Sequence, residues 1–168
     1  MGSGGGSGTG TGTGSGTAGG GSTGGPDSNT VQKGIRPAII LYSQGIGLMH
    51  AKKFAEAQAK FEQAITENPN FAESHNYLGY SLQMEGPQHY SVALEHYNKA
   101  IQLKPNLAEA YEYRGVLLLR MGRKTAAEKD LATLKTLRPK LATELERVIK
   151  AGRNENKSAM KQSGTLPE

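Results

Sequence analysis

One spacing recurs three times along the chain and constrains its fold more than any other feature. In residues 108–141 two small residues, Gly115 and Ala127, stand at helical offsets before a closing proline. Residues 72–107 carry the same residue classes, and residues 38–71 carry them once more. A unit of about 34 residues with small residues at fixed offsets is typical of stacked helix–turn–helix repeats. The sequence therefore predicts an all-α domain of three helical hairpins.

Each unit divides into two predicted helices, and the second helix ends before a proline. The predicted helices are 38–51, 54–67, 72–85, 90–103, 108–121 and 124–137. The pairs Asn70 with Glu73 and Asn106 with Glu109 predict capping boxes at two of the junctions. Two extra residues after Gly86 predict a longer surface turn, with a partner-contacting loop as the alternative.

The repeats are flanked by segments of different composition. Residues 1–25 are almost purely Gly, Ser and Thr, which cannot bury apolar surface, so residues 1–36 are expected to form a disordered tether. Pro37 suits the first turn of a helix. An apolar stripe near the other end predicts a capping helix over 141–151, so the domain is expected to span 37–152. The polar residues 153–168 are expected to form a disordered tail.

The residues at these offsets resemble those of the tetratricopeptide repeat (TPR) family. The shared positions are Gly45, Gly79, Gly115, Ala57, Ala93, Ala127, Pro69, Pro105 and Pro139. The resemblance implies a right-handed superhelix of three hairpins plus a capping helix, and a role as an interaction scaffold. The sequence departs from the family at Leu41, His75 and Tyr111, where tryptophan is favoured, and at Lys52, where a turn glycine is expected.

The resemblance also implies that the first helix of each unit lines a concave groove. At helical spacing this face carries several apolar and aromatic side chains that packing within a repeat does not require, which predicts an interaction surface. The predicted groove residues are Ile39, Tyr42, Ile46, Met49, Asn76, Tyr80, Gln83, Glu112, Val116 and Leu119, with Glu73 and Glu109 on the same stripe.

The predicted function is recognition of a peptide or helix of a partner protein in this groove. The alternative is a self-associating assembly module whose groove is covered by its own flanks or by another copy. Family members that hold chaperone C-termini use a clamp of Lys, Asn and Arg. At the matching positions this chain has Tyr42, Ile46, Tyr77, Glu109 and Tyr113, so that clamp is missing and that role is not expected.

Arg114 stands directly before Gly115, where the second unit has Leu78. A buried arginine needs a partner, and Asp130 lies on the facing helix of the same unit. The pair is predicted to be a structural ion pair, as in a known variant of the family. The alternative is a ligand-binding arginine.

Catalytic and metal chemistry is not expected. The chain has no cysteine, and no two of its four histidines stand at the i, i+4 spacing of helical metal ligands. The two aspartates, Asp27 and Asp130, do not combine with them into a catalytic group. The sequence therefore predicts a protein that is not an enzyme and has no cofactor.

The net charge of +5 is concentrated in the third unit, which carries eight Lys/Arg against four Asp/Glu. This excess predicts a solvated basic end, with a patch for an acidic partner as the alternative. No RNA-binding strand motif accompanies it, so nucleic acid is not an expected partner. No apolar run is long enough to span a membrane. The expected location is the cytoplasm. The alternative is an exported or lipid-anchored bacterial protein without its leader, because the Gly/Ser/Thr tether resembles the start of such proteins.

Overall fold

The computed structural model describes residues 28–162, with side chains over 36–152, and it is helical throughout its ordered elements. The elements are α1 (Ser28–His50), α2 (Phe54–Glu67), α3 (Ala72–Glu85), the short 3₁₀ helix η1 (Pro87–His89), α4 (Tyr90–Leu103), α5 (Ala108–Arg120), α6 (Lys124–Leu137) and α7 (Pro139–Gln162). Among the described residues there is no strand. Within the same residues, no helix is long and apolar enough to cross a bilayer.

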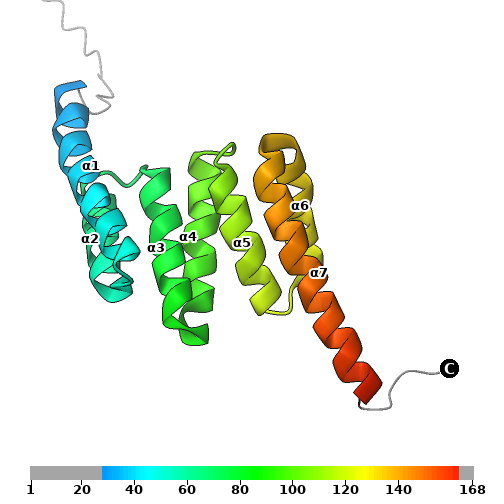
Figure 1. Ribbon diagram of the computed structural model, residues 1–168. Helices are drawn as coiled ribbons and strands as arrows, with labels where there is room; N and C mark the ends of the chain where they lie inside the picture. Colours follow the sequence, from blue (N-terminus) through cyan, green and yellow to red (C-terminus); the bar gives the residue numbers. More distant parts are fainter. Residues whose placement is uncertain (1–27, 163–168) are drawn as a thin grey trace, which may run out of the picture.

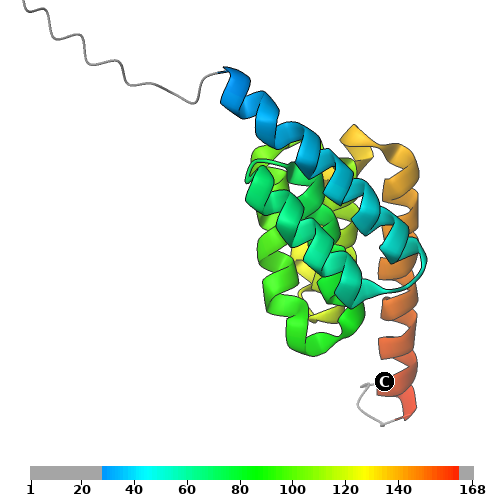
Figure 2. The ribbon, with the colours of Figure 1, turned by 90° about the vertical axis from the view of Figure 1, so that its left-hand side faces the viewer.

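The helices form a row of antiparallel hairpins, α1–α2, α3–α4 and α5–α6, and α7 closes the end of the row (Figure 1). We term α1, α3, α5 and α7 the A helices, and α2, α4 and α6 the B helices. The A helices lie on one side of the row and the B helices behind them, as the turned view in Figure 2 also shows. We term the side formed by the A helices the A-face.

The core runs between the two layers. Phe61 and Tyr97 on B helices are fully buried and pack with Leu78 and Leu117 from A helices. A second cluster buries Leu145 of α7 among residues of α5 and α6, so that α7 covers the last apolar face of the array. Three hairpins and a capping helix thus form the superhelix that the repeat pattern predicts.

Small residues stand where helices approach most closely. Ala57, Ala93 and Ala127 on the B helices are fully buried. At Gly79 a methyl group would lie 3.0 Å from the carbonyl oxygen of Ala93, and at Gly45 it would lie 2.6 Å from the ring of Phe61. The spacing of small residues in the sequence therefore marks the positions where the helices cross.

Three turns depend on left-handed backbone conformations. Gly86 has φ 125° and Gly122 has φ 73°, and glycine adopts both at little cost. Lys52 occupies the corresponding position of the first hairpin with φ 60°. The longer connection of the second hairpin contains the three-residue helix η1, a surface turn in which the side chain of Gln88 donates to the carbonyl of Glu85 at 3.0 Å.

The terminal helices are longer than the sequence pattern predicts. Helix α1 begins at Ser28, within the expected tether, and Pro37 lies inside it. Residues 28–36 contain a single glycine, unlike the segment before them, and the fixed φ of proline is compatible with helix at the loss of one hydrogen bond. The remainder of the expected tether, residues 1–27, lies outside the described residues.

Helix α7 likewise continues through Gly152 to Gln162, so the expected stop at that glycine was wrong. One glycine inside a helix costs only about 1 kcal/mol relative to alanine, and no proline follows before the helix ends. The end of the expected tail, residues 163–168, lies outside the described residues.

Candidate functional site

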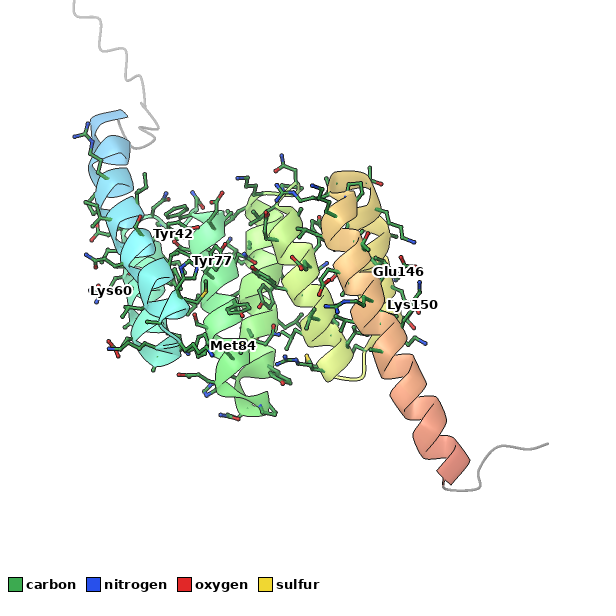
Figure 3. The ribbon with its side chains drawn as sticks, in the orientation of Figure 1. Tyr42, Lys60, Tyr77, Met84, Glu146 and Lys150 are labelled. Carbon is green, nitrogen blue, oxygen red and sulfur yellow. The ribbon has the colours of Figure 1, made fainter. Side chains whose placement is uncertain are left out.

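Four tyrosines from α1, α3 and α5 follow one another across the A-face. The ring centroids of Tyr42 and Tyr77 are 5.8 Å apart, those of Tyr77 and Tyr113 are 6.3 Å apart, and those of Tyr113 and Tyr80 are 5.0 Å apart. These distances are typical of favourable aromatic pairs. Each ring is partly buried, and Tyr42 and Tyr77 lie at the junction of α1 and α3 (Figure 3). We term these four residues the tyrosine strip.

Three hydroxyl groups of the strip, those of Tyr42, Tyr77 and Tyr113, have raised pKa values and remain protonated at neutral pH. Burial raises the pKa of Tyr42 to about 12, with smaller contributions from Tyr77 and from the carboxylates of Glu73 and Glu109. Burial also raises the pKa of Tyr77 and Tyr113. These three residues therefore present neutral hydroxyl groups beside apolar rings, a combination common at protein interfaces.

A pocket of about 300 Å³ opens at one end of the strip. Tyr42 and Tyr77 line it together with two acidic residues, Glu73 and Glu109, and with the amide of Asn76. Lys104, Leu107 and Arg138 complete the wall from the α4–α5 and α6–α7 connections. The volume lies at the lower end of the range for ligand pockets, so the pocket fits a single side chain better than a large ligand.

The two acidic residues of the pocket do not cap helices. Helices α3 and α5 begin after Phe71 and Leu107, and neither has a side-chain capping bond, so the predicted capping boxes were wrong. Instead, Lys104 Nζ donates to Glu73 Oε1 at 2.6 Å, and Arg138 Nη1 donates to Glu109 Oε1 at 2.5 Å. The same pairing thus occurs at two successive repeat junctions.

The remaining predicted groove residues differ in exposure. Ile39 is 48% exposed, whereas Ile46 and Met49 are partly buried and pack against the core. Val116 and Leu119 pack against the cluster that includes α7. The stripe therefore exposes less apolar surface than the sequence predicted, because the core of the array covers part of these side chains.

Three polar positions of the stripe are also more buried than predicted. Gln83 is 3% exposed and accepts a hydrogen bond from the buried Tyr97 hydroxyl at 2.9 Å, which makes it a core residue. Asn76 is 1% exposed but lines the pocket. Burial raises the pKa of the half-buried Glu112, with Glu109 and Glu144 adding to the effect.

In the sequence, Tyr77 and Tyr113 stood out only as positions that lack the Lys, Asn and Arg of the chaperone-binding clamp. Each follows a groove position by one residue, at Asn76 and Glu112, and helical geometry turns it toward the neighbouring A helix. Lys104 and Arg138 were missed because they lie in connections between repeats. A basic residue near the end of the second and third units was the available signal.

Arg114 and Asp130 form a two-bond ion pair between α5 and α6. Arg114 Nε donates to Asp130 Oδ2 at 3.0 Å and Nη2 donates to Oδ1 at 2.6 Å, with the Asp130 side chain 4% exposed. The third arginine nitrogen donates to Asn98 Oδ1 at 2.7 Å, and the ring of Tyr111 lies 5.5 Å from the guanidinium carbon. The arginine is thus held on three sides within the fold.

A second polar pair joins α3 to α4. The Nδ1 atoms of His75 and His96 are 3.1 Å apart, and His75 Nε2 lies 3.2 Å from the Pro69 carbonyl oxygen. No third ligand joins them: across the described residues no group of three or more His, Cys, Asp or Glu side chains could hold a metal ion.

Comparison with known proteins places the repeats in a family. Residues 42–86 match a family described as a tetratricopeptide repeat, and residues 88–122 match one described as a TPR repeat. No match was found among curated protein sequences.

Several solved structures share the fold at low sequence identity. The first TPR domain of the human RPAP3 protein has a TM-score of 0.65 at 20% identity, covering 73% of this chain and 96% of that one. The Arabidopsis OM64 TPR domain has a TM-score of 0.65 at 18% identity, covering 70% and 98%. The Yersinia enterocolitica secretion chaperone SycD, in complex with a peptide of the translocator YopD, has a TM-score of 0.61 at 18% identity, covering 77% and 97%.

Proposed function

Because the chain is a tetratricopeptide repeat protein, we propose that its A-face binds a segment of a partner protein, in extended or helical form. The tyrosine strip carries this proposal. Tyr42, Tyr77, Tyr80 and Tyr113 form a continuous aromatic surface on three A helices, and each ring keeps part of its surface open to solvent. Tyrosine supplies large contact area at low entropic cost, which is why it is enriched among residues that dominate binding.

Similar structures support an interaction role. The first and second TPR domains of Spaghetti (RPAP3) are each bound to the HSP90 peptide SRMEEVD, and SycD is in complex with a YopD peptide. The partner of this chain differs in chemistry from that HSP90 peptide, since Glu109 and the tyrosines Tyr42, Tyr77 and Tyr113 stand where a carboxylate clamp would. An acidic residue at such a position disfavours an acidic C-terminus.

The test uses a displayed library of random peptides of about 12 residues, selected against the purified protein. A selected peptide is then measured by fluorescence anisotropy against wild type and Tyr80→Ala. We expect Tyr80→Ala to weaken binding about tenfold or more, because an aromatic anchor is lost. The matched control is Val92→Ala, which truncates an exposed apolar side chain on the B helix α4 and should leave binding unchanged.

Two results would overturn the proposal. One is that no peptide is enriched by the wild-type protein. The other is that Tyr80→Ala binds as tightly as wild type while Arg123→Ala/Lys124→Ala loses binding, which would assign recognition to the basic end. Because Tyr80 also packs on Tyr113 and has Phe54 6.4 Å away, its variant is compared well below its unfolding temperature.

A second candidate is self-association through the first hairpin. Ile39 and Ile40 on α1 are 48% and 59% exposed, and paired apolar side chains of this kind are common in interfaces between copies. SycD is also described in an alternative dimer. Light scattering over a range of concentrations tests this candidate, and a mass that stays at that of one chain rules it out.

A further inference from the structure

The pocket at the end of the tyrosine strip contains a buried amide without a partner. Asn76 is 1% exposed, its Oδ1 is fully buried, and among the described residues nothing hydrogen-bonds to its side chain. Native proteins satisfy most buried polar atoms, so an unsatisfied one that lines a pocket indicates a place for a ligand group. Oδ1 accepts hydrogen bonds, so the group that completes it is a donor.

The two carboxylates of the pocket retain accepting capacity. Lys104 and Arg138 each donate to one oxygen, Oε1, and within the described residues no donor occupies the Oε2 atoms of Glu73 and Glu109. Lys104 and Arg138 are 45% and 56% exposed, so they lie at the rim. Each carboxylate therefore keeps one oxygen that can accept a further hydrogen bond while its rim cation stays in place.

The aromatic walls favour a positive charge as well. Tyr42 and Tyr77 line the pocket, and the faces of tyrosine rings attract cations. Glu73 and Glu109 raise the pKa of both hydroxyls in addition to the effect of burial, although each carboxylate is already paired. At the two hydroxyl groups the carboxylates thus contribute a negative potential, beside the paired cations Lys104 and Arg138.

We propose that this pocket receives the guanidinium group of an arginine in the partner segment. This inference rests on the proposed function and specifies its partner. A guanidinium offers five N–H donors in one plane and stacks on aromatic rings, which matches separated acceptors at Asn76, Glu73 and Glu109 beside two tyrosines. An ammonium group is a compact point charge and would leave more of these acceptors unused.

The pocket can be tested without a partner protein. The probes are Nα-acetyl-arginine methylamide and its neutral isostere, Nα-acetyl-citrulline methylamide, titrated into ¹⁵N-labelled protein while the Asn76 side-chain amide signals are followed by NMR. We expect the arginine compound to bind in roughly the millimolar range. Its dissociation constant should be about tenfold lower than that of the citrulline compound, with shifts centred on residues 73–77 and on the Asn76 amide.

Two variants distinguish binding in the pocket from binding elsewhere on the protein. Asn76→Leu should abolish the arginine preference, whereas Gln63→Leu, the same kind of change at an exposed position on α2, should leave it intact. If Asn76→Leu does not fold, Glu109→Gln serves instead. Its side chain is 28% exposed, and the variant should reduce the preference severalfold.

The proposal is overturned if arginine and citrulline compounds bind equally, if Nα-acetyl-glutamate methylamide or the lysine analogue binds best, or if the shifts fall elsewhere. The outcome is distinguishable from that of the proposed function. If the arginine compound binds but no peptide is selected, the pocket proposal stands and partner binding on the A-face is overturned. If selected peptides bind equally well after their arginine is replaced by citrulline, partner binding stands and the pocket proposal is overturned.

Discussion

At the scale of single residues, three polar side chains have a role in the structure that differs from the one the repeat pattern predicts. Glu73 and Glu109 stand at capping positions in the sequence but pair with Lys104 and Arg138 in the structure. Asn76 reads as an exposed groove residue yet is buried beside an open pocket. In each case the partner lies about 30 residues away or is missing, so local pattern does not reveal it.

Lys52 gives a prediction that concerns backbone strain. Its φ of 60° is left-handed, a conformation that costs an L-residue about 1–2 kcal/mol but costs glycine little. Lys52→Gly should therefore stabilise the protein by about 0.5–1 kcal/mol, after the larger entropy of glycine in the unfolded chain is subtracted. Urea unfolding measures the change. The converse variant, Gly122→Lys at φ 73°, should destabilise, and a loss of stability in Lys52→Gly would contradict the account.

The Arg114–Asp130 pair gives a prediction about coupling. Arg114→Leu leaves the 4%-exposed carboxylate of Asp130 without its charged partner and should cost about 1–3 kcal/mol of stability. The double variant Arg114→Leu/Asp130→Ala should recover part of that loss, because no buried charge remains. A double-mutant cycle by denaturant unfolding measures the interaction, and strict additivity would show that the two residues act independently.

At the scale of helices, the spacing of small residues was the most informative signal. The period and the three hairpins followed from it, because small residues are required wherever two helix axes come close, whereas the capping helix followed from an apolar stripe. The ends of α1 and α7 could not be predicted the same way. Before Pro37 and after Gly152 the sequence no longer follows the repeat pattern, and helix extension there depends on weak local preferences.

The site was predictable in part for a related reason. Helical periodicity selects Tyr42 and Tyr80, and in the structure their rings lie next to those of Tyr77 and Tyr113 on neighbouring A helices. The contacts that link their rings through Tyr77 and Tyr113 depend on how neighbouring A helices pack. The periodicity of one helix does not predict that packing. Gln83 was wrongly predicted to be a groove residue, because its hydrogen bond is to Tyr97, which lies 14 residues later on another helix.

The α3–α4 crossing gives a prediction about glycine. In Gly79→Ala the new methyl group would meet the Ala93 carbonyl oxygen at 3.0 Å, and backbone cannot move aside cheaply, so we expect a loss of about 1–3 kcal/mol. Gly47→Ala is the matched control on α1. Nothing lies within 4 Å of its added methyl, and helix propensity should make it more stable by about 0.5–1 kcal/mol. Thermal and urea unfolding check both signs, and equal effects would contradict the crossing.

The same pair of helices gives a prediction about pH. Burial, then the neighbouring His75, lowers the pKa of His96 to about 4, and burial lowers the pKa of His75 with a smaller effect of Lys99. An unfolded histidine titrates near 6.5, so the unfolded chain binds more protons below that pH and the folded state loses stability as pH falls. Between pH 7 and 5.5 we expect a loss of about 1 kcal/mol, after allowance for partial solvent exposure.

His96→Gln should flatten this dependence, whereas His50→Gln, at an exposed position, should keep it. The free energy of unfolding at several pH values, from urea titrations, gives the slopes. A steep slope that survives His96→Gln would assign the dependence to other groups.

At the scale of the whole molecule, the array separates stability from recognition. The B helices and the buried sides of the A helices form the core, and α7 covers its last apolar face. The tyrosine strip is formed by the A helices, and its four side chains are partly exposed beside the pocket. The basic excess of the third unit includes Arg123, in the α5–α6 connection, and Lys124, the first residue of α6.

Binding of a partner segment along the A-face, over the tyrosine strip, can be mapped residue by residue. The measurement is chemical-shift mapping of ¹⁵N-labelled protein with a peptide from the displayed library. We expect the perturbed amides to cluster on α1, α3 and α5 around Tyr42, Tyr77, Tyr80 and Tyr113, with the B helices unaffected on their outer faces. Perturbations centred on α2, α4 and α6, or on the basic turn at Arg123 and Lys124, would contradict this expectation.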